Sequence, residues 1–280
     1  MAHQLEGGYL YNKSRTHASE GTLVSVITIV YNGDKYLEQT ILSVLNQDYK
    51  NIEYIIVDGG STDNTLDIIK KYENQIAYWV SGPDKGISDA FNKGITLSTG
   101  ELIGIINADD WFEIDAIGEV VKCYKPGSII HGNMQYWNED GSKGMNVMPN
   151  ASLLPQEMTI NHPTVFVDRN VYNQMGLFDT SYKLAMDYHL LLKMYKAGIE
   201  FIYINKTIAN MRLGGASENW IKSYREVKRA KEEILNSKIY PTFIFCWQVI
   251  RRRASEFIAD SPLSFINRLY RRYFSPMKKI

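Results

Sequence analysis

The chain has 280 residues, 45% of them hydrophobic and 22% charged, and its formal net charge is zero. These values are ordinary for a soluble globular protein. No apolar run reaches transmembrane length, and the N-terminus shows no hydrophobic region of a signal peptide. The two cysteines, Cys123 and Cys246, match no metal-binding spacing, and we expect reduced thiols in a cytoplasmic protein.

The charge is spread unevenly along the chain. Residues 221–280 contain 14 Lys and Arg against 5 Asp and Glu, a net charge of +9, and residues 1–220 carry the opposite net charge of −9. Such an asymmetry favours an anionic partner for the basic end, such as a membrane surface or a nucleic acid.

Residues 1–21 are polar and lack periodicity, and we expect a flexible leader there. Beyond it, β-branched runs alternate with segments of helical periodicity. This alternation predicts a parallel sheet whose strands are joined by right-handed crossovers. The expected strands are 23–30, 52–57, 76–80 and 102–106, and the expected helices are 36–45, 61–71 and 87–97.

The second half of the chain begins with a helix after Trp111 and includes a β-hairpin turned at Asp140-Gly141. A Gly-Gly-Ala-Ser segment at 214–217 follows the last expected strand and predicts a mobile loop. The other elements expected here are a helix ending near 124, a strand at 128–132, the hairpin at 134–148, an extended stretch at 160–167, a helix at 183–195, strands at 199–204 and 208–212, and a charged helix at 218–235.

A polar turn follows the buried strand at 102–106. It contains Asn107, Asp109 and Asp110, and two adjacent carboxylates at the end of a strand repel each other unless a cation or strong donors lie near. Oxygen ligands of this kind suit Mg²⁺ or Mn²⁺, which commonly bridge a carboxylate to nucleotide phosphates. The alternative is a plain turn in which Asp110 caps the next helix.

Asp58 ends the strand at 52–57, so its side chain and Asp109 should face one crevice at the carboxyl edge of the sheet. Neither a Gly-x-Gly-x-x-Gly fingerprint nor a Walker motif is present, which argues against a dinucleotide dehydrogenase and a P-loop NTPase.

Four segments together resemble the family-2 glycosyltransferases of the GT-A fold. They are residues 24–32 (VSVITIVYN), 57–63 (VDGGSTD), 84–94 (DKGISDAFNKG) and 107–110 (NADD). The resemblance implies an α/β fold with a mixed, mainly parallel sheet flanked by helices. It implies a catalytic domain at 22–212, with a nucleotide-sugar half at 22–110 and an acceptor half at 111–212, and leaves 213–280 as a helical C-terminal extension.

The resemblance also implies roles for the turn residues. Tyr31, Asn32 and Asp58 would hold the base and ribose of a nucleotide-sugar donor, and Asp84 and Lys85 would also contact the donor. For Asp58 the alternative is a turn residue that hydrogen-bonds its own backbone.

The acidic turn occupies the Asp-x-Asp position of the family, with Asn107 in place of the first Asp. Asn107 would then contact the donor ribose, Asp109 would bind both the donor and Mn²⁺ or Mg²⁺, and Asp110 would be the second metal ligand. The replaced carboxylate removes one negative charge from the site.

Asp187 lies in the first turn of the helix expected at 183–195, where the helix dipole keeps a carboxylate ionised. By resemblance it is the general base of the family's Glu-Asp motif, in which Met186 replaces the Glu; the alternative is helix capping alone. His162 is expected either to lie beside the diphosphate or metal or to be a structural histidine. His189 is a secondary candidate for the site.

The basic C-terminal region mixes aromatic side chains with Arg251–Arg253 and with Arg268, Arg271 and Arg272. This pattern is typical of an interfacial membrane anchor, although a solvated face over a packed helix is the alternative. We therefore expect residues 241–280 to bind an anionic membrane surface at the inner face of the plasma membrane.

These features, together with the resemblance, imply an inverting, metal-dependent glycosyltransferase. It would move a sugar from a nucleotide-diphosphate donor, a UDP-sugar being favoured, to a saccharide or lipid-linked saccharide in cell-surface polysaccharide synthesis. Two alternatives remain from the sequence alone: a non-catalytic nucleotide-sugar-binding protein, and a nucleic-acid-binding protein that uses the basic tail.

Overall fold

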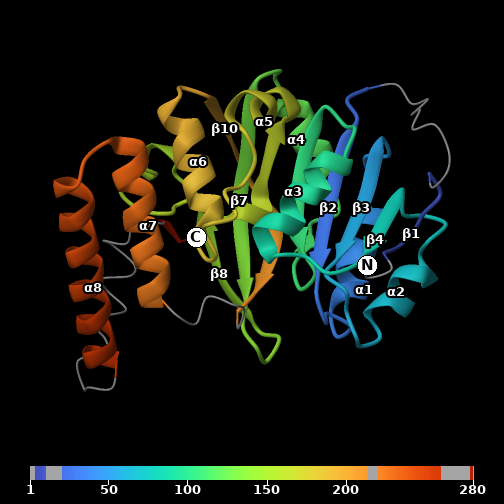
Figure 1. Cartoon of the computed structure of the whole chain (residues 1–280), viewed down its shortest axis with the longest axis horizontal. Coiled ribbons are helices and arrows are strands. Elements are labelled where there is room, and N and C mark those ends of the chain that lie inside the picture. Colours follow the sequence, from blue (N-terminus) through green and yellow to red (C-terminus); the bar gives the residue numbers. More distant parts are fainter. Residues whose placement is uncertain (1–3, 11–20, 214–219, 260–277, 280) are drawn as a thin grey trace.

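A computed structural model describes residues 4–10, 21–213, 220–259 and 278–279. Within these ranges, eleven strands form one mixed sheet with helices on both faces, and the last two helices lie at one end of the molecule (Figure 1). This is the α/β architecture that the sequence predicts.

The sheet is built from long central strands and shorter strands at its edges. Its order is β1-β4-β3-β2-β5-β9-β7-β10-β6, with β8 paired to β7 and β11 to β8. The strands are β1 (Leu5–Gly7), β2 (Val24–Val30), β3 (Ile52–Asp58), β4 (Tyr78–Ser81), β5 (Leu102–Asn107), β6 (Trp111–Phe112), β7 (Ser128–Trp137), β8 (Lys143–Met148), β9 (Val165–Asp168), β10 (Glu200–Arg212) and β11 (Lys278–Lys279).

Eight α-helices and two short 3₁₀ turns connect or cover these strands within the described ranges. They are α1 (Leu37–Leu45), α2 (Thr65–Lys71), α3 (Ile87–Leu97), α4 (Ala116–Cys123), η1 (Ala151–Leu153), η2 (His162–Thr164), α5 (Arg169–Met175), α6 (Met186–Lys196), α7 (Trp220–Leu235) and α8 (Ile239–Ala259).

The central strands are mostly apolar because both of their faces are covered. One face carries Ile27, Ile55 and Ile105, whose cluster includes side chains of α3, α6 and α7. The opposite face carries Val26 and Ile56, whose cluster includes side chains of α1, α2 and α4. Strands β4, β3, β2 and β5 run parallel, so the turns that follow them meet at one edge of the sheet.

The segment expected to be a flexible leader, residues 1–21, contains a strand. Leu5–Gly7 pair antiparallel with β4 as an edge strand, and residues 11–20 lie outside the described ranges. The pairing uses main-chain hydrogen bonds, and Leu5 is 47% exposed, so no buried apolar pattern marks this strand in the sequence.

Two further expectations are corrected in the second half. The strands expected at 199–204 and 208–212 are one strand, β10, whose pairing register with β7 is irregular between Ile204 and Ala209. The strand β6 was not expected, because it has only two residues. The hairpin of β7 and β8 is confirmed. The loop expected at 214–217 lies outside the described residues.

Helices α7 and α8 contact the segment around Gln156 and Glu157. The buried Lys231 of α7 donates to the carbonyl of Gln156 at 2.5 Å, and Arg251 of α8 forms an ion pair with Glu157 at 2.6 Å. No helix in the described part of the chain is long and apolar enough to span a bilayer.

Candidate active site

The loops after β2 and β3 are tied together by Asn32. Its main-chain N–H donates to Ser61 Oγ at 2.8 Å, and its side-chain oxygen accepts from the N–H of Thr62 at 2.9 Å. Asn32 has φ of 49°, a left-handed conformation that Asn adopts more readily than most residues. These contacts fix the turn that begins with Tyr31.

Asp58 lies beneath this turn and is fully buried. Its carboxylate accepts from Ser81 Oγ at 2.6 Å and from the N–H and hydroxyl of Ser61. These hydrogen bonds show that Asp58 holds the turn, and its contact with a donor stays a prediction. The alternative of a turn-stabilising residue describes the observed geometry.

Replacing Asp58 with alanine is expected to lower the free energy of unfolding by about 2–4 kcal/mol, because hydrogen bonds to a buried charged group are lost and Ser81 is left without its acceptor. Urea unfolding of the variant measures this. An unfolding free energy equal to that of the wild type would contradict the structural role.

Tyr31 and Asp84 converge over Gly59. A Cβ on Gly59 would lie 2.7 Å from Asp84 Oδ2 and 3.3 Å from a ring carbon of Tyr31, so only glycine leaves this space open. The Tyr31 ring is 66% exposed, and Lys85 follows on the exposed turn before α3. An exposed aromatic face beside a carboxylate is a suitable platform for a flat polar ring such as a nucleobase.

The acidic turn after β5 places Asp109 and Asp110 differently. Asp109 is partly exposed, whereas Asp110 is 1% exposed and its Oδ1 has no hydrogen-bond partner among the described residues. Burial, and then the charge of Asp109, hold the pKa of Asp110 well above its usual range. Asn107 donates to the other oxygen of Asp110 at 3.4 Å.

This turn fits a divalent cation. The unpartnered oxygen of Asp110 and the neighbouring carboxylate of Asp109 are two hard oxygen donors side by side. The described residues contain no group of three or more His, Cys, Asp or Glu arranged for a metal. The protein would therefore supply two carboxylates, and substrate phosphates and water the remaining ligands, an arrangement common for Mg²⁺.

Arg212 was not found by sequence reasoning. Its guanidinium lies 4.2 Å from the ring centre of Tyr36 and 4.4 Å from that of Trp111, and it donates to the main-chain oxygen of Asp109 at 3.4 Å. A cavity of about 880 Å³ opens here, lined by Lys35, Tyr36, Gln39, Asp109, Trp111, Trp137, Asn138, Glu139, Asp140, Gly141, Arg212 and Leu213. Arg212 brings a fixed positive charge to the acidic turn.

Asp187 lies at the start of α6 and is partly buried. Its Oδ1 accepts from the N–H of Tyr188 at 2.7 Å, yet burial raises the pKa of Asp187 to about 6. The carboxylate is thus ionised at neutral pH and more basic than an exposed Asp, which suits a general base.

The two histidines have different surroundings. The ring of His162 stacks on Phe91 at 5.0 Å, and burial lowers its pKa to about 4, so it is neutral at pH 7. His189 is buried, stacks on Tyr182 at 4.5 Å and has Nε2 3.4 Å from Glu233. In the structure His189 packs on Tyr182, and it stays a secondary candidate for the site.

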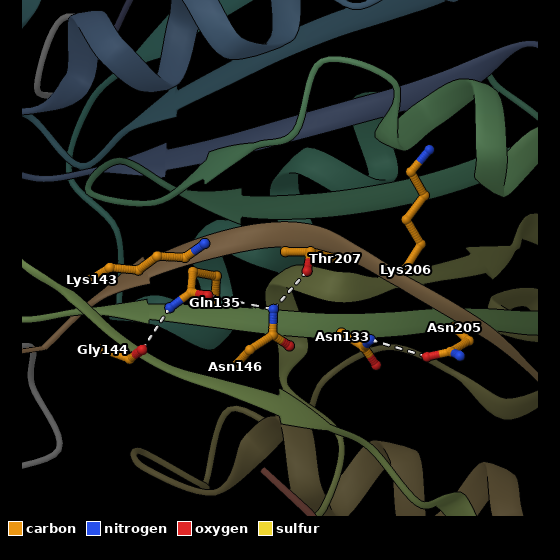
Figure 2. A pocket seen from close by; sticks show the side chains of 8 residues that line it. All are labelled: Asn133, Gln135, Lys143, Gly144, Asn146, Asn205, Lys206 and Thr207. Atoms are coloured by element: carbon orange, nitrogen blue, oxygen red, sulfur yellow. Dashed lines mark hydrogen bonds between the residues drawn. The ribbon is translucent and has the colours of Figure 1, made fainter. Parts of the chain in front are cut away.

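A second, polar cavity of about 470 Å³ lies over β7, β8 and β10 (Figure 2). Its polar side chains hydrogen-bond one another. Asn146 donates to the hydroxyl of Thr207 at 2.7 Å, and Asn133 Nδ2 lies 3.5 Å from Asn205 Oδ1. We call this cavity the amide trough, lined by Asn133, Gln135, Lys143, Gly144, Asn146, Asn205, Lys206 and Thr207.

Comparison with known proteins agrees with this arrangement. The model of Glycosyl transferase family 2 matches residues 25–176, just over half of the chain. The hyaluronan synthase of Pasteurella multocida is 31% identical over 74% of this chain, and the chondroitin synthase of Pasteurella multocida strain Pm70 is 30% identical over 82%. The chain spans only 22% and 25% of the lengths of these two relatives.

Solved structures share the fold at low sequence identity. S. aureus TarS 1–349 in complex with UDP-GlcNAc has a TM-score of 0.60 at 17% identity, covering 86% of this chain and 74% of that one. The mannosyltransferase PcManGT from Pyrobaculum calidifontis, in complex with GDP-Man and Mn²⁺, has a TM-score of 0.61 at 16% identity, covering 91% and 82%. The fold is GT-A, and with its strand-end turns and its match to the family model the chain belongs to glycosyl transferase family 2.

Proposed function

We propose that the chain is an inverting glycosyltransferase that moves a sugar from a nucleotide-diphosphate donor, a UDP-sugar being favoured, to a saccharide or lipid-linked saccharide acceptor. The observation that carries the proposal is the placement of an open aromatic cradle and a charged acidic turn along one sheet edge. Its relatives include polysaccharide synthases, which favours a role in cell-surface polysaccharide synthesis.

The donor would lie along that edge. Tyr31 and Asp84 would hold the base over Gly59, with Asn32 and Lys85 beside them. Asp58, which holds the turn, would also contact the base or ribose. The diphosphate would reach Asn107 and Asp109, where Arg212 adds positive charge. Mn²⁺ or Mg²⁺ held by Asp109 and Asp110 would neutralise the diphosphate charge when bound.

Asp187 would act on the acceptor. Its carboxylate takes the proton from an acceptor hydroxyl while that oxygen attacks the anomeric carbon. The new bond forms on the face opposite the departing nucleoside diphosphate, so the configuration at the anomeric carbon inverts. His162 is neutral at pH 7 and would contribute packing or a neutral contact to the diphosphate or metal.

The amide trough would receive the acceptor saccharide. Amide and hydroxyl groups such as those of Asn205 and Thr207 offer donors and acceptors that match sugar hydroxyls. Lys143, which is exposed at the rim, adds a positive charge that would suit an acidic sugar.

A thermal-shift panel tests donor binding, because a ligand that binds only the folded state stabilises it by about 2.7 kcal/mol at a concentration of 100 Kd. The panel uses UDP-GlcNAc, UDP-glucuronic acid, UDP-glucose and GDP-mannose, each with and without Mn²⁺. We expect stabilisation by at least one UDP-sugar, larger with Mn²⁺. Unchanged melting temperatures with every donor would contradict the proposal.

We also propose that α8 brings the enzyme to an anionic membrane at the inner face of the plasma membrane. Exposed apolar side chains recur at helical spacing along α8, with exposed fractions of 67% for Phe243, 51% for Trp247 and 61% for Ile250. Arg252 and Arg253 are also exposed on this helix. Arg251 is paired with Glu157, and Arg268, Arg271 and Arg272 lie outside the described residues.

The full chain is expected to co-sediment with vesicles containing phosphatidylglycerol, and a Phe243→Ser, Trp247→Ser variant is expected to lose most of this binding. Insertion of aromatic side chains adds affinity that salt does not screen, so added salt should weaken wild-type binding only in part. Ile114→Ser is the control, since Ile114 is 65% exposed on another surface. Equal sedimentation of the wild type and the double variant would contradict the anchor.

A further inference from the structure

The start of α6 is held by a side chain of another helix. The carboxylate of Glu226 on α7 accepts from the main-chain N–H groups of three consecutive residues: Lys183 at 3.0 Å, Leu184 at 2.7 Å and Ala185 at 2.9 Å. These three residues directly precede Met186, where α6 begins. Glu226 thus binds the turn from which the helix and Asp187 project.

This contact brings a carboxylate to a helix start that has no side-chain cap. The N-cap residue Ala185 has no side chain that could accept a hydrogen bond, and no side-chain cap is formed there. The first N–H groups of a helix need acceptors, and a carboxylate at that end also interacts favourably with the helix dipole. Glu226 supplies the negative charge from 41 to 43 residues away in sequence.

The consequence for Asp187 is direct. An Asp in the first turn of a helix often serves as a cap, which was the alternative to a catalytic role. Here the N–H groups of residues 183–185 have an acceptor in Glu226, and the Asp187 carboxylate accepts from the N–H of Tyr188 within the first turn. The two carboxylates therefore bind different N–H groups, and Glu226 holds the segment from which Asp187 projects.

Helix α7 is itself firmly placed. Val227 and Ala230 are buried in the core cluster that includes Met186. One turn beyond, Glu233 accepts from the hydroxyl of Tyr182 at 3.0 Å and approaches His189, and Lys231 bonds the carbonyl of Gln156. The carboxylate of Glu226 therefore projects from a fixed support.

We propose that Glu226 is the positioning residue of the catalytic base: by binding the N–H groups of residues 183–185, it fixes the direction in which Asp187 meets the acceptor hydroxyl. This inference rests on the proposed function, because it assigns Asp187 the role of general base. It makes the C-terminal extension part of the active site, since α7 lies beyond the catalytic domain expected at 22–212.

The test compares Glu226→Ala and Glu226→Gln with Glu233→Gln. Glu233 lies on the same helix and bonds Tyr182 and His189, but not the N–H groups of residues 183–185, so Glu233→Gln is a matched control. The steady-state assay uses the donor and acceptor that the wild type turns over, and the donor KM and kcat are measured separately.

We expect Glu226→Ala to lower kcat by on the order of 10²-fold, the loss associated with a displacement of about 1 Å in a reacting group, with the donor KM unchanged. Glu226→Gln keeps one acceptor oxygen and should recover part of kcat. A kcat of Glu226→Ala within a few-fold of Glu233→Gln, or a donor KM that rises as much as kcat falls, would overturn the proposal.

Hydrogen exchange separates this proposal from the proposed function. The amides of residues 183–185 should exchange faster in Glu226→Ala than in Glu233→Gln, while the amides of the central strands remain equally protected. Equal exchange at 183–185 would overturn the positioning role even if transfer is observed. A wild type that transfers no sugar although these amides respond would instead overturn the base role of Asp187 and the inference that depends on it.

Discussion

Replacing Asp187 with asparagine is expected to reduce kcat by about 10²–10⁴-fold, the usual contribution of a general base. Asparagine keeps the size of the side chain and can accept from the N–H of Tyr188, but its amide cannot take the proton of the acceptor hydroxyl. Donor binding, measured by thermal shift, should be unchanged because the donor edge is untouched.

His189→Gln is the control for this substitution, because His189 lies two residues further on and packs on Tyr182 away from the proposed reaction. It should leave kcat within a few-fold of the wild type. Turnover of Asp187→Asn at a comparable level would show that another group, such as His162, accepts the proton.

The raised pKa of Asp187 has two measurable consequences. Turnover should fall as the pH drops below about 6, because the protonated carboxyl no longer acts as a base. At pH 7 the Asp187 carboxylate is charged in both states, but it is buried in the folded protein and solvated in the unfolded chain. Below about pH 4 the carboxyl group is protonated in both states. Asp187→Asn should therefore raise the free energy of unfolding at pH 7, by about 1–3 kcal/mol, and not at pH 4.

Replacing Asp109 with alanine is expected to lower transfer by at least about 10³-fold and to abolish the extra thermal stabilisation that Mn²⁺ gives to the bound donor. The reason is electrostatic: the turn loses its exposed carboxylate, and the departing diphosphate keeps its charge uncompensated. Measurement of turnover and of donor thermal shifts, with and without Mn²⁺, tests both parts.

Glu139→Ala provides the matched control, because Glu139 lines the same cavity from the hairpin but is not part of the acidic turn. It should retain metal-supported donor binding. Wild-type turnover that survives treatment with a chelator would show that the metal assignment is wrong.

The sequence predicted those parts of the fold and the site that follow from a local pattern of residues. Buried parallel strands read as continuous apolar runs, and the residues that follow them share one edge of the sheet. The pattern therefore predicts that Asp58 and the turn of Asp109 lie at one edge, and the parallel pairing of β3, β2 and β5 agrees. The helix expected at 87–97 has those bounds in the structure. The hairpin was marked by Asp140-Gly141.

What the sequence missed depends on contacts between distant segments. Arg212 reaches Asp109 across 103 residues, and its register on β10 follows from an irregularity that no pattern marks. The hydrogen bond that Asp58 accepts from Ser81 of the neighbouring strand is likewise not marked by any local pattern. Glu226 lies on a charged helix whose sequence resembles any solvated amphipathic helix, and only the packing of α7 on α6 reveals its contact.

The most direct test of glycosyl transfer is product analysis. The wild-type chain and Asp187→Asn are incubated with Mn²⁺, the UDP-sugar that stabilises the fold, and a panel of oligosaccharide acceptors, and the products are examined by mass spectrometry and NMR. We predict that one acceptor gains a single sugar with inverted anomeric configuration, that UDP is released in equal amount, and that Asp187→Asn forms little product. Retained configuration, or equal product from the variant, would contradict the mechanism, and the absence of any extended acceptor would contradict glycosyl transfer itself.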